Sequence, residues 1–297
     1  MSALALSPDV YGSFARFSAV ADFLELRALR SPQVIVREPD LERRIETDGI
    51  RLSSPLGPSA SDSAQAAGIV FEVFEERARI LGMRYPFHVS RRNGLRRSTK
   101  VIGGYRVLLA MTAAHAYRVK CGDPKKLFEG LVTRALEQLG LRSATTGTSR
   151  KQKKRGFTGM LEAACNDVGL EASPDGSILS EAAQDEKVDT LAHLDLGDGR
   201  SGRWTFIGQA TIAESGEWER KASEPKPKLW RALIGDTHDP SPFLAVPYHV
   251  EANHLDSLHA RLPAVVLDRL RLAATGLTPS KEERALVAAV DACRVEW

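Results

Sequence analysis

Apolar residues recur every three to four positions along much of this chain of 297 residues, which is the spacing of amphipathic helices. The spacing predicts helices over residues 12–30, 69–82, 105–117, 157–169, 255–274 and 280–296. A further helix is predicted to begin after Asp123, an N-cap residue that is followed by proline, and to stop at Gly140.

The pattern changes to short apolar runs between residues 185 and 212, where a charged turn separates two such runs. The segments RYPFHVS (84–90) and FLAVPYHV (243–250) are also typical of short strands, and Asn93-Gly94 indicates a turn. Helices and strands mixed in this order predict an α/β or α+β chain.

Composition limits the function classes less than the local pattern does. The hydrophobic content of 43% and charged content of 27% are ordinary for a globular protein, and the net charge of +3 gives no overall reason to expect nucleic-acid binding. The three cysteines form no CxxC or Cys/His cluster, which argues against a zinc site. Without a signal-peptide pattern or a long apolar run, we expect a soluble cytoplasmic protein with no membrane partner.

Polar residues at the ends of the predicted strands are the best candidates for chemistry. Asp189 opens one apolar strand, Gln209 ends the strand that follows Trp204, and Lys221 lies on the next predicted helix. Glu129 lies upstream, on or beside the apolar face of a helix, where a carboxylate needs a partner. Carboxylates with a polar third ligand and a nearby cation are the minimal parts of a Mg²⁺-dependent phosphodiesterase site.

Each candidate also has a plainer interpretation. Asp189 can be a strand-edge or turn acid, and Gln209 can be a buried amide that satisfies the backbone. Glu129 can be a boundary residue of an amphipathic helix, and Lys221 can be a solvated surface lysine.

Several segments together resemble the PD-(D/E)xK, or restriction-endonuclease-like, superfamily, and in particular a bacterial subgroup found near phage-defence genes. The resemblance covers roughly residues 70–275, with nothing similar in 1–60. Its matching segments are Arg84–Phe87, Tyr105–Leu109, Phe128-Glu129, Asp185 to Asp189, Gly208–Thr211, Trp218, Lys221 and Phe243–Pro247.

The resemblance implies a restriction-endonuclease-like core, a central mixed sheet flanked by helices, with an additional helical N-terminal region. A linker-like stretch at 53–68 then separates an N-terminal helical region of unknown role (1–60) from a mostly helical subdomain (69–120). The nuclease core follows at 121–275, and a C-terminal helix at 276–297.

Carried over by position, the resemblance makes Glu129 the helix acid and Asp189 the central metal ligand. Gln209 stands in place of the motif glutamate, and Thr211 stands where the motif lysine belongs. Lys221 must therefore stabilise the attacking hydroxide from the next helix. Mg²⁺ or Mn²⁺ is the implied cofactor, with Asp189, Glu129 and Gln209 as its ligands.

A basic stretch between Glu129 and Asp189 is a candidate for contact with nucleic-acid phosphates, although it can also be a solvated loop. Its cationic residues are Arg150, Lys151, Lys153, Lys154 and Arg155. The leading hypothesis is a DNA endonuclease of a bacterial anti-phage defence or restriction system, with DNA, other proteins of that system and a second copy of the chain as candidate partners. The alternative is a catalytically degenerate nuclease fold that binds DNA or protein. A small-molecule enzyme lacks a GxGxxG, P-loop or GxSxG motif.

Overall fold

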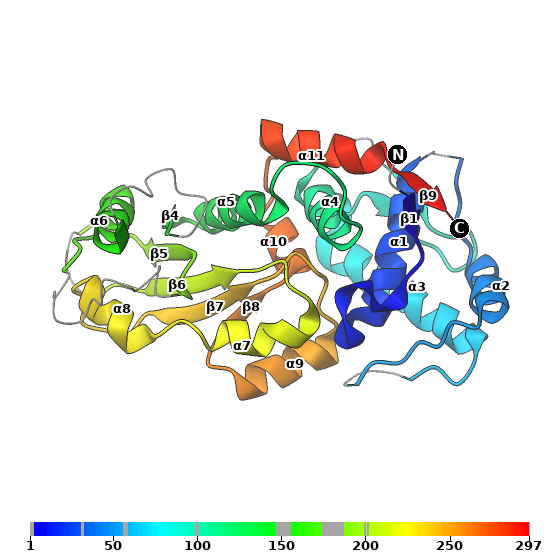
Figure 1. Cartoon of the computed structure of the whole chain (residues 1–297), viewed down its shortest axis with the longest axis horizontal. Helices are drawn as coiled ribbons and strands as arrows, with labels where there is room; N and C mark the ends of the chain where they lie inside the picture. Colours follow the sequence, from blue (N-terminus) through cyan, green and yellow to red (C-terminus); the bar gives the residue numbers. More distant parts are fainter. Residues whose placement is uncertain are drawn as a thin grey trace.

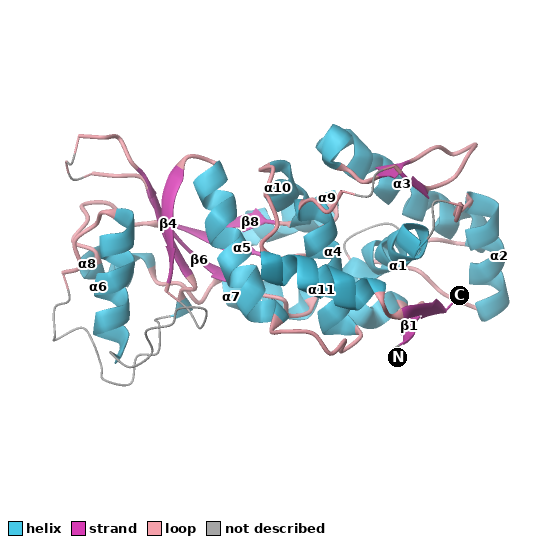
Figure 2. Cartoon of the chain, turned by 90° about the horizontal axis from the view of Figure 1, so that it is seen from above, coloured by secondary structure: helices cyan, strands magenta, loops and turns pink. Residues whose placement is uncertain are grey.

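The computed structural model describes residues 3–30, 33–55, 59–98, 101–146, 156–173, 187–198, 200 and 202–296. Within them the chain forms an elongated molecule with a β-sheet at one end and helices at the other (Figures 1 and 2). Among these described residues, no helix combines the length and apolar character needed to cross a bilayer.

A mixed sheet, which has five strands within the described residues, forms one end of the molecule (Figure 1). Its order is β4 (Leu141–Thr145), β5 (Thr190–Leu194), β6 (Thr205–Ala210), β7 (Ser241–Ala245) and β8 (Val265–Leu267). β4, β5 and β6 pair antiparallel, and β6, β7 and β8 pair parallel. The expectation of an α/β chain with a mixed sheet flanked by helices is therefore confirmed.

Helices cover both faces of this sheet, because alternate strand residues enter different apolar clusters. Ala192 and Ala210 pack in one cluster with Phe128 of α5 (Pro124–Gln138). Leu191 and Ile207 point to the opposite face of the sheet. They pack there with α6 (Gly156–Val168) and α8 (Pro227–Leu233). The short helix α7 (Trp218–Ala222) and α9 (Ala252–Arg261) lie below the sheet in Figure 1, with α5 above it.

The other end of the molecule is a packed group of helices, called the helical half below. It contains α1 (Arg16–Arg30), α2 (Glu38–Asp48), α3 (Ser63–Leu81), α4 (Gly104–Ala116), α10 (Arg269–Ala274) and α11 (Lys281–Asp291). Near the ends of the chain, β1 (Ala3–Ala5) pairs in parallel with β9 (Arg294–Glu296). A small hairpin joins β2 (Phe87–His88) to β3 (Arg96–Arg97).

A buried network of charges joins the helices to the sheet half. Arg269 of α10 donates both of its terminal nitrogens to Asp22 of α1, at 2.6 Å each, and its Nε to the carbonyl of Pro247 beyond β7. Arg77 of α3 contacts Asp22 and Glu25 at 2.8 Å each. Because these side chains are all buried, the network fixes α1 and α3 to the chain that leaves the sheet.

The structure corrects several expected element boundaries. The C-terminal helix expected over 280–296 ends at Asp291, and strand β9 follows it at Arg294–Glu296. The single helix expected over 255–274 is wrong, because α9 ends at Arg261 and strand β8 precedes α10. The stretch 53–68 is only partly a linker, since α3 already begins at Ser63, where the Asp62 side chain accepts from the backbone N–H of Gln65 at 2.8 Å.

Candidate functional site

Asp189 lies at the start of β5 and is held against β6 by its own backbone and side chain. Its N–H donates to the carbonyl of Gly208 at 2.8 Å, and its Oδ2 accepts from the N–H of Ala210 at 3.0 Å. The chain reaches this position through Lys187, whose φ of 56° turns the backbone sharply before the strand. Asp189 is therefore a buried carboxylate in a fixed position beside β6.

Gln209 lies on β6 next to the residue that Asp189 contacts. Its Nε2 donates to the carbonyl of Lys187 at 2.8 Å and to Oε2 of Glu224 at 2.5 Å. Both partners are acceptors, so the amide nitrogen must face them, and within the described residues no hydrogen bond reaches the Oε1 oxygen. Gln209 therefore holds Glu224 in place and presents an oxygen that suits a hard cation.

Glu224 is a member of the site that the sequence reasoning missed. It follows α7 by two residues and receives Lys221 Nζ at 3.3 Å on the oxygen that also contacts Gln209, while Arg220 contacts its other oxygen. Burial raises the pKa of Glu224, but the hydrogen bond from Gln209 and the charges of Lys221 and Arg220 bring it below its ordinary value. Its spacing of three residues from Lys221 is the signal that could have pointed to it.

Thr211 occupies the place of the motif lysine and has a local structural role. Its backbone N–H donates to the carbonyl of Ala245 at 3.0 Å, and its hydroxyl oxygen accepts from the N–H of Ala213 at 3.1 Å. It therefore helps to shape the turn between β6 and α7.

Glu129 is fully buried on α5, so it lies on the apolar side of its helix. Ala210 packs in the cluster that contains α5, so the adjacent Gln209 points away from α5. Glu129 thus approaches the sheet from the face opposite to Gln209 and Glu224. Gln209 and Lys221 are linked through Glu224, and Asp189 contacts the backbone of Ala210 beside Gln209, whereas Glu129 lies on α5 at the other face of the sheet.

The basic residues Arg150, Lys151, Lys153, Lys154 and Arg155 lie outside the described residues, as does Asp185. The last described residue before them, Thr146, directly contacts the candidate site. Its N–H donates to the carbonyl of Asp189 at 2.9 Å, and its hydroxyl donates to the carbonyl of Val188 at 2.6 Å. Thr146 therefore lies beside Asp189.

The donors at this site are oxygens, which suit Mg²⁺ or Mn²⁺ better than zinc. They are the carboxylates of Asp189 and Glu224 and the amide oxygen of Gln209. Within the described part of the chain, His, Cys, Asp and Glu side chains form no group of three or more that could hold a metal. The donor set therefore fits an ion that keeps several waters and takes one or two carboxylates.

Comparisons with protein-family models, with curated proteins and with solved structures found no match to this chain.

Proposed function

We propose that this chain is a Mg²⁺-dependent endonuclease with a restriction-endonuclease-like core, which hydrolyses DNA phosphodiester bonds as part of a bacterial anti-phage defence or restriction system. The observation that supports it best is that the Asp189 carboxylate contacts the backbone of Ala210, next to Gln209, whose side chain is linked through Glu224 to Lys221. Thr146, the last described residue before the basic stretch, lies beside Asp189, and the cationic residues that follow in the sequence suit contact with a phosphate backbone.

In this proposal Asp189 and the Oε1 of Gln209 hold the metal. A bound Mg²⁺ would polarise the phosphate and lower the pKa of a bound water. Lys221 stabilises negative charge near the attacking oxygen, and Glu224 orients the Lys221 ammonium and the Gln209 amide by ionic hydrogen bonds. Glu129 is the helix acid that the resemblance implies, and this proposal assigns it no step.

A second candidate is a degenerate nuclease fold that binds DNA or protein without cutting. It is favoured by Thr211 in the place of a motif lysine and by the pairing of Lys221 with Glu224, which leaves less positive charge for a substrate. The retained, buried carboxylate of Asp189 counts against it.

Metal binding separates the two candidates. Calorimetry with Mn²⁺ should give a measurable heat for the wild-type chain and for the control Asp198→Asn, which changes an acid in the β5–β6 connection whose side chain accepts from the N–H of Arg200. The Asp189→Asn variant should lose this heat, because an amide is a weaker ligand than a carboxylate. Equal binding by wild type and Asp189→Asn would overturn the assignment of the ligand, and absence of binding in the wild type would favour the degenerate fold.

A further inference from the structure

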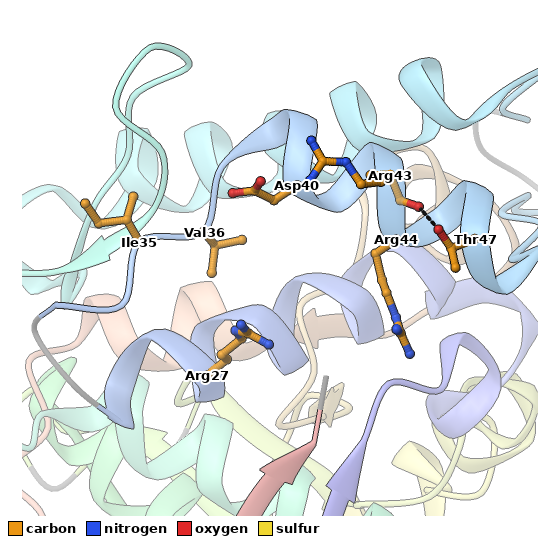
Figure 3. Close-up of a pocket in the computed structure, with 7 residues that line it drawn as sticks. All are labelled: Arg27, Ile35, Val36, Asp40, Arg43, Arg44 and Thr47. Atoms are coloured by element: carbon orange, nitrogen blue, oxygen red, sulfur yellow. Dashed lines mark hydrogen bonds between the residues drawn. The ribbon is translucent and has the colours of Figure 1, made fainter.

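A cavity of about 390 Å³ lies between α1 and α2 (Figure 3). Both helices belong to the helical end of the molecule, away from the sheet (Figure 1). It is lined by Arg27, Ile35, Val36, Asp40, Arg43, Arg44 and Thr47. Figure 3 shows Arg27 rising from α1 and Arg44 descending from α2, so that guanidinium groups reach the gap from both helices. Asp40 and Arg43 lie at the side formed by α2.

Helix geometry explains why α2 presents its polar residues to this gap. Asp40, Arg43, Arg44 and Thr47 recur at intervals of three and four, so they share one face of the helix. The packing of α2 relies on other positions, the buried Leu41 and Ile45. The arginines are therefore not required to fill the core.

Three arginines and one aspartate line the cavity. Arg44 contacts Asp48 at 2.6 Å, while Arg43 is exposed and has no ion-pair partner among the described residues. Burial lowers the pKa of Arg27; the nearby Asp40 partly offsets this, and the positive charge of Arg44 lowers it further. Like charges in a partly desolvated hollow are unfavourable, and a bound anion would relieve that repulsion.

We propose that this cavity binds a small phosphate-bearing ligand. Arginine forks from two helices match the oxygens of a phosphate group, which accept paired hydrogen bonds. Ile35 and Val36 supply an apolar wall for an uncharged part of the ligand, and the volume lies within the range of small-molecule sites. This binding site is independent of the proposed nuclease centre, because it uses none of its residues.

The test is calorimetry at low salt with the full chain and inorganic phosphate, pyrophosphate, ATP and a short DNA duplex as separate probes. The variants are Arg27→Gln and Arg44→Gln, with Arg118→Gln as the control, because Arg118 is an exposed arginine that lies after α4 and not in the cavity. Wild type should bind at least one of the three small probes with a Kd below about 1 mM. Each cavity variant should weaken that binding about 10-fold or more, as expected for a lost charge-assisted hydrogen bond, and the control should not.

A matched measurement guards against misfolded variants. Thermal unfolding followed by circular dichroism should show that the binding probe raises the Tm of wild type and of Arg118→Gln, and not that of folded Arg27→Gln or Arg44→Gln. Failure of wild type to bind any small probe, or equal loss in Arg118→Gln, would overturn the proposal. If Arg27→Gln and Arg44→Gln weaken binding of the DNA duplex alone, the proposal would also be overturned, in favour of a surface that binds the nucleic-acid backbone.

Discussion

Arg269→Ala tests whether the buried charge network holds the helical half against the sheet half. Arg269 is 0% exposed and its partner Asp22 is 1% exposed, so removal of the guanidinium leaves a buried carboxylate without its bidentate partner. The same change also removes the donor to the carbonyl of Pro247 and a contact to the hydroxyl of Thr112 at 3.1 Å. The expected result is a strongly destabilised chain.

The magnitude follows from what remains around Asp22. Removing one member of a buried ion pair typically costs about 3–5 kcal/mol. Arg77 still contacts Asp22 at 2.8 Å, so we expect the lower end, about 3 kcal/mol. At roughly 2–4 °C per kcal/mol for chains somewhat shorter than this one, Tm should fall by about 6–12 °C.

Urea and thermal unfolding, followed by circular dichroism, measure this change. The control is Arg271→Ala on the same helix, an exposed arginine whose contact with the carbonyl of Val266 is worth about 1 kcal/mol or less. A loss below about 1 kcal/mol for Arg269→Ala, or a loss equal to that of Arg271→Ala, would refute the reasoning.

The network also predicts acid sensitivity. Burial raises the pKa of Asp22, but Arg269 and Arg77 bring it below its ordinary value. A carboxyl whose folded pKa is depressed stabilises the fold above its unfolded pKa of about 3.9, and that stability is lost as pH falls through the folded pKa. Wild type should therefore lose stability below about pH 4, with a shallower loss in Asp22→Asn.

Three further changes test other parts of the structure. In Gly208→Ala, the new Cβ would lie 2.4 Å from the ring of Phe243, so unfolding stability should fall by about 1–3 kcal/mol, while Gly216→Ala, with open space around it, should be neutral. Burial and the charge of Glu76 raise the pKa of Glu251 to about 7. Its folded pKa exceeds the unfolded one, so wild type loses stability as pH rises from about 4.5 to 7, and Glu251→Gln should raise Tm at pH 8 but not at pH 4. Glu224→Gln should lower DNA cleavage about 10–100-fold, as for other residues that orient a metal site.

The results that would contradict these expectations are equally specific. Equal stability of the two glycine variants would mean that Phe243 moves aside without cost. Equal Tm changes for Glu251→Gln at both pH values would show that its ionisation is not linked to folding. Cleavage by Glu224→Gln at the wild-type rate would show that Glu224 has no role in the proposed site. The matched control is Glu219→Gln, which changes an exposed glutamate on α7.

The sequence pattern predicted the parts of the fold in which apolar spacing is strong. α4, α5 and α6 and the strands around Asp189 and Gln209 follow that pattern closely. It did not predict β4, because an edge strand with the sequence LRSAT buries few apolar side chains and reads as a polar loop.

Other errors came from signals that compete in a single sequence. The segment PAVVL was assigned to the same helix as the sequence before and after it. Pro263 and the N-cap residue Asp268 are signals that the helix is interrupted there. Glu224 was missed because its partner Gln209 lies on a strand fifteen positions away along the chain, a contact that spacing does not reveal. Asp189 and Gln209 were selected as candidates because polar residues at the ends of buried strands stand out in the sequence pattern.

The most direct test of the proposed nuclease is cleavage of plasmid and linear double-stranded DNA with Mg²⁺ or Mn²⁺. Wild type and Asp198→Asn should cut in the presence of metal, and Asp189→Asn should not, because Asp189 is the proposed central ligand. Cutting that persists in Asp189→Asn at the wild-type rate would contradict the proposed site, whereas its loss in Asp189→Asn alone would assign the activity to this end of the sheet.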